Sequence, residues 1–221
     1  MYAKYWKRFF DFTLSLLALI VLSPVLLILT IVGAIAMRGN PFFVQPRPGR
    51  IDPKTGKERI FKLIKFRTMS NGKDKDGNLL PDEQRLNKYG RFLRKTSLDE
   101  IGELLNILVG DMAIVGPRPW SIEYLPYYTD EEHNRHSVRP GLTGYAQVHG
   151  RTKASWNDRI LCDLEYVSNV TLKNDIKIII ETIGYTLKHS DVVITGEEQG
   201  DFSNYRIAQW EEQKKDGYVR K

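Results

Sequence analysis

Cysteine is almost absent from this chain: Cys162 is the only one among 221 residues. A single cysteine excludes an internal disulfide and is typical of a protein in a reducing compartment. No histidine lies near it in the sequence, so we interpret Cys162 as a small buried apolar side chain rather than a nucleophile. A Walker-type phosphate loop, a dinucleotide-binding glycine fingerprint and a serine-centred nucleophile motif are absent too. The chemistry therefore has to come from other residues.

Charged side chains are missing from the whole stretch between Phe12 and Met37. A straight helix of that length reaches about 39 Å, enough to cross a hydrocarbon core about 30 Å thick. Proline removes a backbone donor and clashes with the preceding turn, so we expect the helix to kink or break at Ser23-Pro24. The Ser23 hydroxyl can satisfy the carbonyl that such a break frees. The sequence therefore predicts a membrane anchor with a break in its middle.

Basic residues lie on both sides of this anchor. They are Lys4, Lys7 and Arg8 before it, and Arg38, Arg47 and Arg50 after it. Positive charge collects on the cytoplasmic side of membrane segments, so two positive ends favour a re-entrant helix–break–helix that returns to the face it entered. A kinked transmembrane helix is an alternative. A cleaved signal peptide is a third, because Ala34-Ile35-Ala36 resembles a cleavage site, but the apolar run is longer than the usual 7–15 residues, roughly, of such a region.

The net charge of +6 and the isoelectric point near 9.3 indicate an anionic partner. Behind an apolar anchor, lipid headgroups and phosphates fit this charge better than nucleic acid does. We expect a helix-rich α+β fold with an anchor over 1–40, one globular domain over 41–190 and a charged tail over 191–221. No internal repeat is visible.

Local patterns predict several elements after the anchor. They are a Pro/Gly-rich turn over 45–50, a strand over 60–67, a surface loop over 71–82, helical spacing over 98–108, a short helix capped by Thr129 and Glu132, a turn-rich stretch over 139–144, and helices over 160–167 and 176–187. The last helix has its isoleucines on one face, which fits either a core or a bilayer surface. The pattern weakens from Asp191 onward.

Asp99 and Glu100 stand where a helix is expected to begin. Ser97 with Glu100 has the spacing of a capping box, and Thr96 with Asp99 has it one residue earlier. Acidic residues in a first turn often serve only the helix. The same position also seats a phosphate, and a carboxylate held there can act as a nucleophile on phosphorus or as a metal ligand. We expect the nearby cations Arg91, Arg94 and Lys95 to lower the pKa of these carboxyls.

A second candidate is Arg118, which stands between Pro117 and Pro119 on a stiff backbone. Its guanidinium suits bidentate binding of a phosphate, although a rigid surface turn is the simpler interpretation. The basic residues of the predicted strand, Lys62, Lys65 and Arg67, form either a solvated face or a phosphate-binding edge. The histidines His133, His136 and His149 have no recognisable metal-ligand spacing.

In their order along the chain, these pieces resemble the bacterial sugar transferase family, whose members are monotopic phosphoglycosyl transferases. The resemblance runs from Lys7 to about Lys188. It is carried by the Lys7–Asp11 start, Ser23-Pro24, the Gln45/Arg47/Gly49 stretch, Lys65–Met69, Ser97–Glu100, Gly110–Met112, Val115–Pro119, Arg139–Gly144 and Gly150-Arg151.

The resemblance implies that an aspartate attacks the β-phosphate of a UDP-sugar and releases UMP. A membrane polyprenol phosphate, undecaprenyl phosphate, then takes the sugar phosphate from that carboxylate, and Mg²⁺ is required. Carried over, Asp99 is the nucleophile and a metal ligand, and Glu100 assists. We assign substrate binding to Lys62, Arg67, Arg94, Pro117, Arg118, Pro119 and Arg151. The re-entrant anchor places the catalytic domain on the cytoplasmic face of a bacterial inner membrane, and a homodimer is a further expectation.

The sequence departs from the family pattern at Ile101-Gly102, because many members have proline at the position of Gly102. Glycine is a poor helix former, so this departure concerns the placement of Asp99. Two other hypotheses remain. One is a membrane-anchored basic scaffold without catalysis. The other is a glycosyltransferase that releases UDP, for which only Asp74-Lys75-Asp76 has the metal-binding Asp-x-Asp spacing, in a loop of turn residues.

Overall fold

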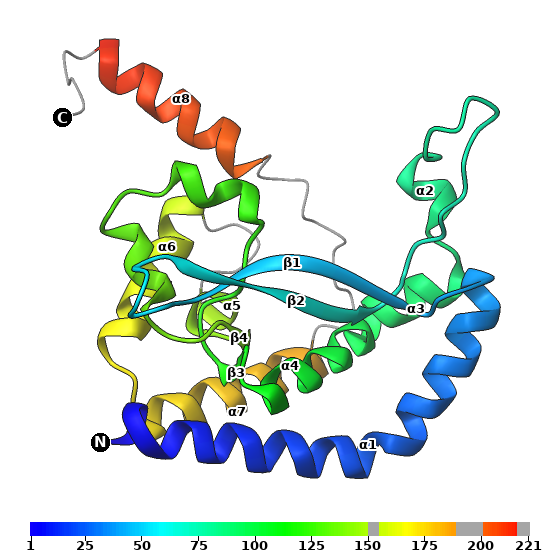
Figure 1. Cartoon of the computed structure of the whole chain (residues 1–221), viewed down its shortest axis with the longest axis horizontal. Coiled ribbons are helices and arrows are strands. Elements are labelled where there is room, and N and C mark those ends of the chain that lie inside the picture. Colours follow the sequence, from blue (N-terminus) through cyan, green and yellow to red (C-terminus); the bar gives the residue numbers. More distant parts are fainter. Residues whose placement is uncertain (150–154, 189–200, 216–221) are drawn as a thin grey trace.

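The uncharged stretch folds into one long helix, α1 (Lys7–Met37), which a π-helical turn over Tyr2–Trp6 precedes. The structure, a computed structural model, describes residues 1–149, 155–188 and 201–215. In Figure 1, α1 runs along one edge of the molecule and then bends toward the β1–β2 ribbon. Within the described residues, Tyr2–Met37 is the stretch that is long and apolar enough to cross a membrane.

Helix α1 continues through Ser23-Pro24, so a full helix–break–helix is not what the structure has. Figure 1 shows a bend in α1, which we attribute to Pro24 inside the helix. Pro24 has no N–H to donate to Ile20, four residues earlier. The Ser23 hydroxyl donates to the Ile20 carbonyl instead, at 2.7 Å, as the sequence predicts. The freed carbonyl is thereby satisfied, and the two halves of α1 stay joined.

The remaining elements confirm the helix-rich α+β class. They are β1 (Phe42–Ile51), β2 (Glu58–Phe66), α2 (Asp82–Arg85), α3 (Lys88–Thr96), α4 (Glu103–Val109), β3 (Ala113–Val115), β4 (Gly141–Thr143), α5 (Tyr145–His149), α6 (Trp156–Ser168), α7 (Leu172–Lys188) and α8 (Phe202–Lys215), with 3₁₀ turns over Leu98–Gly102, Ile122–Tyr127 and Glu132–Ser137. The strands form two separate pairs: β1 with β2 is antiparallel, and β3 with β4 is parallel.

The turn expected over residues 45–50 is wrong, because this stretch is part of β1. Register runs from Phe42 opposite Phe66 to Pro48 opposite Ile60, and an irregularity follows toward Ile51. Proline is tolerated here because both strands of a two-stranded ribbon are edges, so its nitrogen can face away from the partner strand. The β1–β2 ribbon crosses the middle of the molecule in Figure 1.

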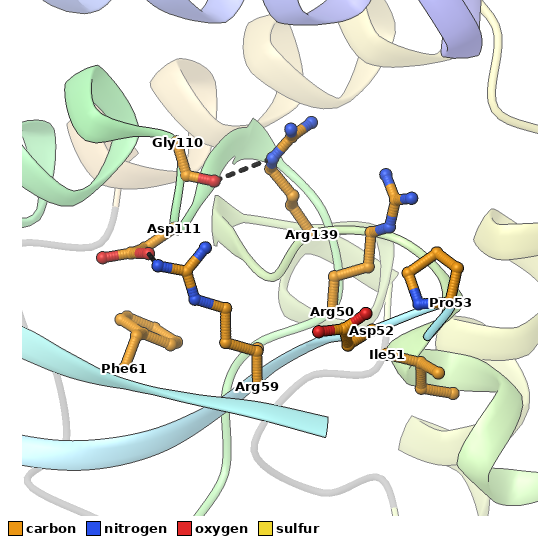
Figure 2. A pocket seen from close by; sticks show the side chains of 10 residues that line it. Arg50, Ile51, Asp52, Pro53, Arg59, Phe61, Gly110, Asp111 and Arg139 are labelled. Atoms are coloured by element: carbon orange, nitrogen blue, oxygen red, sulfur yellow. Dashed lines mark hydrogen bonds and ion pairs between the residues drawn. The ribbon is translucent and has the colours of Figure 1, made fainter. Parts of the chain in front are cut away.

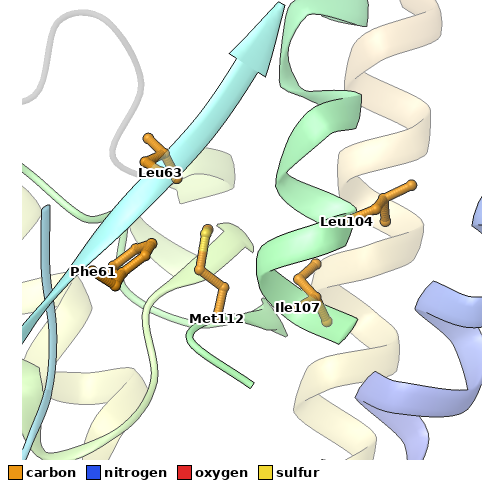
Figure 3. Close-up of a cluster of buried hydrophobic side chains, with 5 residues drawn as sticks. All are labelled: Phe61, Leu63, Leu104, Ile107 and Met112. Carbon is orange, nitrogen blue, oxygen red and sulfur yellow. The ribbon is translucent and has the colours of Figure 1, made fainter. Parts of the chain in front are cut away.

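The core that positions the site lies between β2, α4 and α1. Figure 3 shows Phe61 and Leu63 of β2 beside Met112, with Leu104 and Ile107 projecting from α4. Three residues of α1, namely Ala18, Leu19 and Leu22, pack against this cluster. The candidate membrane helix is therefore also a wall of the protein core.

Polar contacts fix the beginning of α1 to the rest of the chain. Arg8 donates to the carbonyls of Ile107 (2.5 Å) and Leu108 (2.7 Å) at the C-terminal end of α4, where a cation also complements the helix dipole. Lys7 donates to Asp175 of α7 at 2.7 Å, and both side chains are buried. The start of α1 is thus locked to α4 and α7.

The other predicted elements have mixed outcomes. Helices α6 and α7 confirm the predictions over 160–167 and 176–187, and β2 confirms the strand. The pair Thr129 and Glu132 makes both reciprocal capping bonds, at 2.7 and 3.3 Å, although they precede a 3₁₀ turn. The turn-rich stretch 139–144 contains β4. Within the stretch expected as a charged tail, residues 202–215 form α8, while 191–200 and 216–221 lie outside the described residues.

Candidate active site

Asp99 and Glu100 lie in the 3₁₀ turn Leu98–Gly102, between α3 and α4. The expected capping boxes are absent: Ser97 is left-handed (φ 53°) and ends α3, and the Thr96 hydroxyl donates backwards to the Phe92 carbonyl at 2.8 Å. The helix start that the pattern predicted at Asp99–Glu100 is therefore a tight connection between α3 and α4. Neither carboxylate is consumed by capping this turn.

Gly102 explains how this turn sits on the sheet. A Cβ atom at this position would stand 2.8 Å from the Ile64 carbonyl oxygen of β2, closer than real Cβ contacts come. The turn therefore packs directly on the backbone of β2, which a side chain would prevent. The departure from the family pattern at Gly102 thus seats the Asp99–Glu100 turn closely on the strand that carries Lys65.

Glu100 is held by two cations from different elements. Its Oε1 accepts a hydrogen bond from Lys65 Nζ at 2.8 Å and from Arg118 Nη2 at 2.7 Å. Lys65 Nζ is also 3.0 Å from Glu103 Oε1. Burial acts to raise the pKa of Glu100, but Arg118 and Lys65 outweigh it and hold this pKa below its usual range. Glu100 is therefore an ionised group that orients both cations.

Asp99 behaves in the opposite way, and the expectation of a lowered pKa is wrong for it. Burial raises the pKa of the Asp99 carboxyl, and the negative charge of Glu100 raises it further. The cations that oppose this rise are Lys65 and Arg118, rather than the expected neighbours in the chain. A carboxylate that is poorly stabilised by its surroundings gains more from a bond to an electrophile or a cation.

The fully buried side chain of Arg135 holds the backbone at Arg118 in place by a hydrogen bond to its carbonyl. Arg135 Nη2 donates to the Arg118 carbonyl at 2.9 Å and to Asp163 Oδ2 at 2.5 Å, and Nη1 donates to the Tyr128 hydroxyl at 3.0 Å. Its guanidinium carbon also lies 4.1 Å from the ring centre of Trp120. The Arg118 fork is therefore presented on a segment that has little freedom to move.

A cavity of about 370 Å³, called here the basic cavity, lies beside these groups. It is lined by Arg47, Leu63, Lys65, Glu103, Arg118, Pro119, Trp120, Ser121, Tyr124, Trp156 and Arg159. The cations crowd one another: burial lowers the pKa of Arg47 and of Arg159, and the charge of Arg118 lowers both further. Such a cluster favours a polyanion, and the aromatic rings offer flat apolar faces beside it.

A second cavity of about 490 Å³, called here the apolar cleft, opens between α1 and α7. Its lining residues are Ala18, Leu22, Ser97, Glu100, Ile101, Leu104, Ile114, Leu142, Thr143, Gln147, Val148, Ile179, Thr182, Ile183, Tyr185 and Thr186. Most of this lining is apolar. Glu100 lines the apolar cleft, while its ion-pair partners Lys65 and Arg118 line the basic cavity, so the two spaces meet at this carboxylate.

A third cavity of about 310 Å³ lies farther along the β1–β2 ribbon. Figure 2 shows Arg50, Arg59 and Arg139 around it, with Arg139 donating to the Gly110 carbonyl at 2.8 Å. Arg59 Nη2 is 4.0 Å from Asp111 Oδ1. None of the assigned site residues that the structure describes lines this cavity, so we place the chemistry at the other two.

The structure brings together only part of the assigned set. Arg118 and Pro119 line the basic cavity, and Asp99 and Glu100 lie beside it. Pro117 is buried one residue earlier. Arg94 donates to Thr68 (3.1 Å) and to the Met69 sulfur (3.0 Å), and Arg67 donates to the Phe42 carbonyl (3.2 Å). Neither arginine lines the basic cavity or the apolar cleft. Arg151 lies outside the described residues.

Lys65, which was not assigned to substrate binding, lines the basic cavity, whereas Lys62, which was assigned, does not. Lys62 is exposed, and it alternates with Phe61 and Leu63, which face the core. Lys65 shares the side of β2 with Phe61 and Leu63 and reaches Glu100. This alternation was visible in the sequence and favours Lys65. Arg47, Glu103 and Arg159 were also not assigned, and nothing local to them marks them as cavity residues.

Oxygen donors suited to Mg²⁺ are present at Asp99. Mg²⁺ prefers carboxylate and phosphate oxygens, and it commonly takes one or two carboxylates while substrate phosphates and water complete its shell. The Asp99 carboxyl fits, because its pKa is raised by burial and by a neighbouring anion, both of which a cation would offset. Glu100 fits less well, because Lys65 and Arg118 already occupy its Oε1.

A group that the sequence did not predict joins two histidines to Glu58. The Nδ1 atoms of His133 and His136 lie 2.6 and 3.1 Å from Glu58 Oε1, and these are the described residues whose ligand atoms cluster as metal ligands do. His136 Nε2 faces Arg135 Nη1 at 3.4 Å. Because the Arg135 guanidinium can only donate, Nε2 of His136 is the acceptor, and the proton of the neutral ring is on Nδ1. His136 therefore donates from Nδ1 to Glu58 and is not free to bind a metal.

Comparison with known proteins agrees with this geometry. The sequence model of the bacterial sugar transferase family matches residues 2–189. An uncharacterized sugar transferase, EpsL of Bacillus subtilis, is 45% identical over 177 residues, which cover 80% of this chain and 85% of EpsL. The exopolysaccharide production protein ExoY of Sinorhizobium fredii is 36% identical, over 80% of this chain and 83% of its own.

Longer relatives match as well. The undecaprenyl-phosphate galactose phosphotransferase of Salmonella typhimurium is 34% identical over 84% of this chain, and the undecaprenyl-phosphate glucose phosphotransferase of Komagataeibacter xylinus is 36% identical over 80%. The aligned regions cover only 41% and 35% of these two relatives. Because the family match extends over most of the residues and includes the Asp99–Glu100 turn, the chain belongs to the bacterial sugar transferase family.

Proposed function

We propose that this protein transfers a sugar 1-phosphate from a UDP-sugar to undecaprenyl phosphate and releases UMP. The observation that carries the proposal is the meeting of two unlike cavities at Glu100. A basic cavity suits a nucleotide sugar, and an apolar cleft suits a polyprenyl chain. The relatives named for undecaprenyl-phosphate phosphotransfer support the same reaction class.

In the first step, a carboxylate oxygen of Asp99 attacks the β-phosphorus of the UDP-sugar. A bond forms between Asp99 and phosphorus while the bond from phosphorus to the oxygen bridging the two phosphates breaks. The electron pair of that bond leaves with UMP. Lys65 and Arg118, oriented by Glu100, neutralise charge on the phosphates, and Arg47 and Arg159 extend this positive surface.

In the second step, a phosphate oxygen of undecaprenyl phosphate attacks the same phosphorus from the apolar cleft. The bond to Asp99 breaks, its carboxylate is regenerated, and a diphosphate-linked sugar remains on the lipid. The two substrates need not be present together, because Asp99 carries the sugar phosphate between the steps. Asp99 would hold Mg²⁺, and the ion would supply charge neutralisation at the phosphates.

The membrane arrangement belongs to the same proposal. The bend at Ser23-Pro24 and the positive residues at both ends support a re-entrant α1 that leaves the remaining domain on the cytoplasmic face of the inner membrane. Ile180 and Ile183 are exposed on α7, and Ile183 lines the apolar cleft together with Ala18 and Leu22 of α1. The apolar cleft then opens toward lipid, where its substrate is found.

Replacing Asp99 tests the proposal directly. We expect Asp99→Asn to lower UMP release from UDP-sugars by at least about a thousandfold, because an amide cannot act as the nucleophile. Denaturing gels after incubation with β-³²P-labelled UDP-sugar, without lipid acceptor, should show label on the wild-type chain and none on the variant.

Asp76→Asn is the matched control, since Asp76 lies exposed in the loop with the Asp-x-Asp spacing and its carboxylate makes no contact that the structure describes. It should retain full activity and labelling. Near-normal turnover by Asp99→Asn would remove the nucleophile from the mechanism. Release of UDP instead of UMP, with activity lost in Asp76→Asn, would make the protein a glycosyltransferase. Silence with every UDP-sugar would favour the scaffold.

A further inference from the structure

The C-terminal helix α8 is the described element that the family match, residues 2–189, does not reach. Its first residue, Phe202, is fully buried, at 0% exposure. The Phe202 ring lies 5.6 Å from Trp120, 5.4 Å from Tyr124 and 5.4 Å from Trp156, measured between ring centres. All three of these rings line the basic cavity. Helix α8 therefore supports the aromatic side of this cavity from behind.

Polar contacts hold α8 in this place. Arg206 Nη2 lies 2.5 Å from Glu132 Oε1, and both side chains are buried. The Tyr124 hydroxyl donates to Asp201 Oδ2 at 3.1 Å, directly before α8 begins. A buried charge without its partner is costly, so the pair of Arg206 and Glu132 fixes how α8 docks. The contacts of Arg206 with Glu132 and of Asp201 with Tyr124 thus hold Phe202 among the aromatic rings.

The basic cavity has two chemically different sides. Lys65, Arg118 and Arg47 provide the side that suits the phosphates of a nucleotide sugar. Trp120, Tyr124 and Trp156 provide the other, and aromatic faces pack well against the C–H faces of a sugar ring or against a base. Their positions in the cavity depend on what fills the space behind them.

The relatives indicate which of these ligand parts varies. Two of them are named for undecaprenyl-phosphate transfer, one with glucose and the other with galactose, so their names share the lipid and differ in the sugar. An element outside the family match is a better candidate for selecting the sugar, which differs between these relatives, than for binding the lipid, which they share. Because α8 lies outside that region and supports the aromatic side, the sugar is its expected target.

We propose that α8, through Phe202, shapes a sugar subsite at Trp120, Tyr124 and Trp156 and thereby selects which UDP-sugar is used. This inference rests on the proposed function. Phe202 is a positioning residue, because it acts through rings that contact the sugar. Loss of the Phe202 ring lets these rings shift and weakens the discrimination between sugars that differ in the orientation of a hydroxyl group.

The test compares kcat/KM for UDP-glucose, UDP-galactose and their N-acetylated counterparts in the wild type, Phe202→Leu and Phe202→Ala. Leucine keeps an apolar side chain behind the rings, so Phe202→Leu remains informative if Phe202→Ala fails to fold. Ile207→Ala is the control, because Ile207 lies on α8 but is exposed. Inhibition by UMP is measured in parallel, since UMP contains the nucleotide without the sugar.

We expect Phe202→Leu to lower the ratio of kcat/KM between the preferred and the next-best sugar by about tenfold, within the range that packing differences in an apolar pocket produce. UMP inhibition should stay within about twofold of wild type, and Ile207→Ala should change neither. An equal fall for every sugar, or weaker UMP inhibition, would overturn the sugar subsite and place uracil or the whole fold behind the effect. A wild type that releases UMP from no UDP-sugar would refute the proposed function itself, and this inference with it.

Discussion

Arg135 shows, at the scale of single residues, what the sequence does not reveal. It lies in a run of charged and polar residues that is typical of an exposed segment, yet the residue is only 1% exposed. Burial is possible because Asp163, Tyr128 and the Arg118 carbonyl satisfy the guanidinium, and these acceptors lie 7 to 28 residues from Arg135 in the chain. The stiffness of Arg118 was predictable from its flanking prolines, whereas the support beneath it was not.

His136 gives the protein a pH-dependent stability that can be measured. Burial lowers its pKa from 6.5 to about 4, so the ring stays neutral in the folded protein. Between these two values the unfolded chain binds a proton that the folded chain does not, and stability therefore falls as pH is lowered through this window. The loss reaches up to about 3 kcal/mol, at about 1.36 kcal/mol for each unit of pKa.

The melting temperature in detergent, followed between pH 7 and pH 4.5, should therefore fall more steeply for the wild type than for His136→Gln. Glutamine has no titrating group, yet its amide can still donate to Glu58. The neighbours Glu58, His133, Tyr128 and Arg135 stay unchanged in this variant. His149→Gln is the matched control, since His149 is partly exposed, and it should follow the wild type. Parallel curves for His136→Gln and the wild type would contradict the assignment.

At the scale of elements, periodicity was a good guide where one face of a helix or strand packs on the core. It identified β2, α6 and α7 because their apolar spacing follows directly from that packing. It failed at β1, where the prolines of 46–48 resemble a turn but lie in a ribbon with two edges. It failed again at α8, whose apolar and polar residues do not segregate to separate faces and which docks mainly through Phe202.

Helix α1 is expected to return to the side of the membrane from which it enters. In a Cys162→Ser background, Lys4→Cys and Gly39→Cys should both react with a membrane-impermeant maleimide in inverted vesicles, and neither should react in intact spheroplasts. Gly39 has open space around the position of a Cβ, so cysteine fits there. A kinked transmembrane helix predicts instead that the two positions react from opposite sides. Labelling after detergent solubilisation serves as the positive control for both cysteines.

At the scale of the whole molecule, the candidate site lies where a basic cavity and an apolar cleft meet. The basic cavity is lined by side chains from β1, β2, α4 and α6 and from the segment after β3. The apolar cleft is lined by side chains from α1, α4, α5 and α7, from β3 and β4, and from the connection between α3 and α4 that carries Glu100. The sequence predicted Asp99, Glu100 and Arg118 through their local motifs. It could not predict that the basic cavity and the apolar cleft meet at Glu100, because this depends on the contacts of Glu100 with Lys65 and Arg118, which lie 35 and 18 residues away in the chain.

Filling the apolar cleft should separate the two half-reactions. Ile183 lines the cleft at its exposed edge, with 55% of its surface accessible, so Ile183→Trp adds bulk in the path of a polyprenyl chain. We expect the KM for undecaprenyl phosphate to rise by about tenfold, while formation of the labelled protein from UDP-sugar keeps its wild-type rate. The measurement combines steady-state UMP release with single-turnover labelling.

Ile180→Trp is the matched control for this variant. Ile180 is exposed on the same helix but does not line the cleft, so tryptophan there should leave both half-reactions unchanged. A slower labelling step in Ile183→Trp would mean that the cleft serves the nucleotide sugar as well. An unchanged KM for the lipid would remove the acceptor from this cleft.

The packing of Ala18 and Leu22 has a consequence for how this enzyme can be handled and how it can evolve. These residues contact the core cluster around Phe61 and Leu104 on one side of α1 and line the apolar cleft. Deleting α1 to obtain a water-soluble fragment would strip one wall from the cleft and expose the core to water. Nor can α1 be exchanged for an unrelated membrane helix of equal hydrophobicity, because its inward face must keep the shape that the catalytic elements pack against.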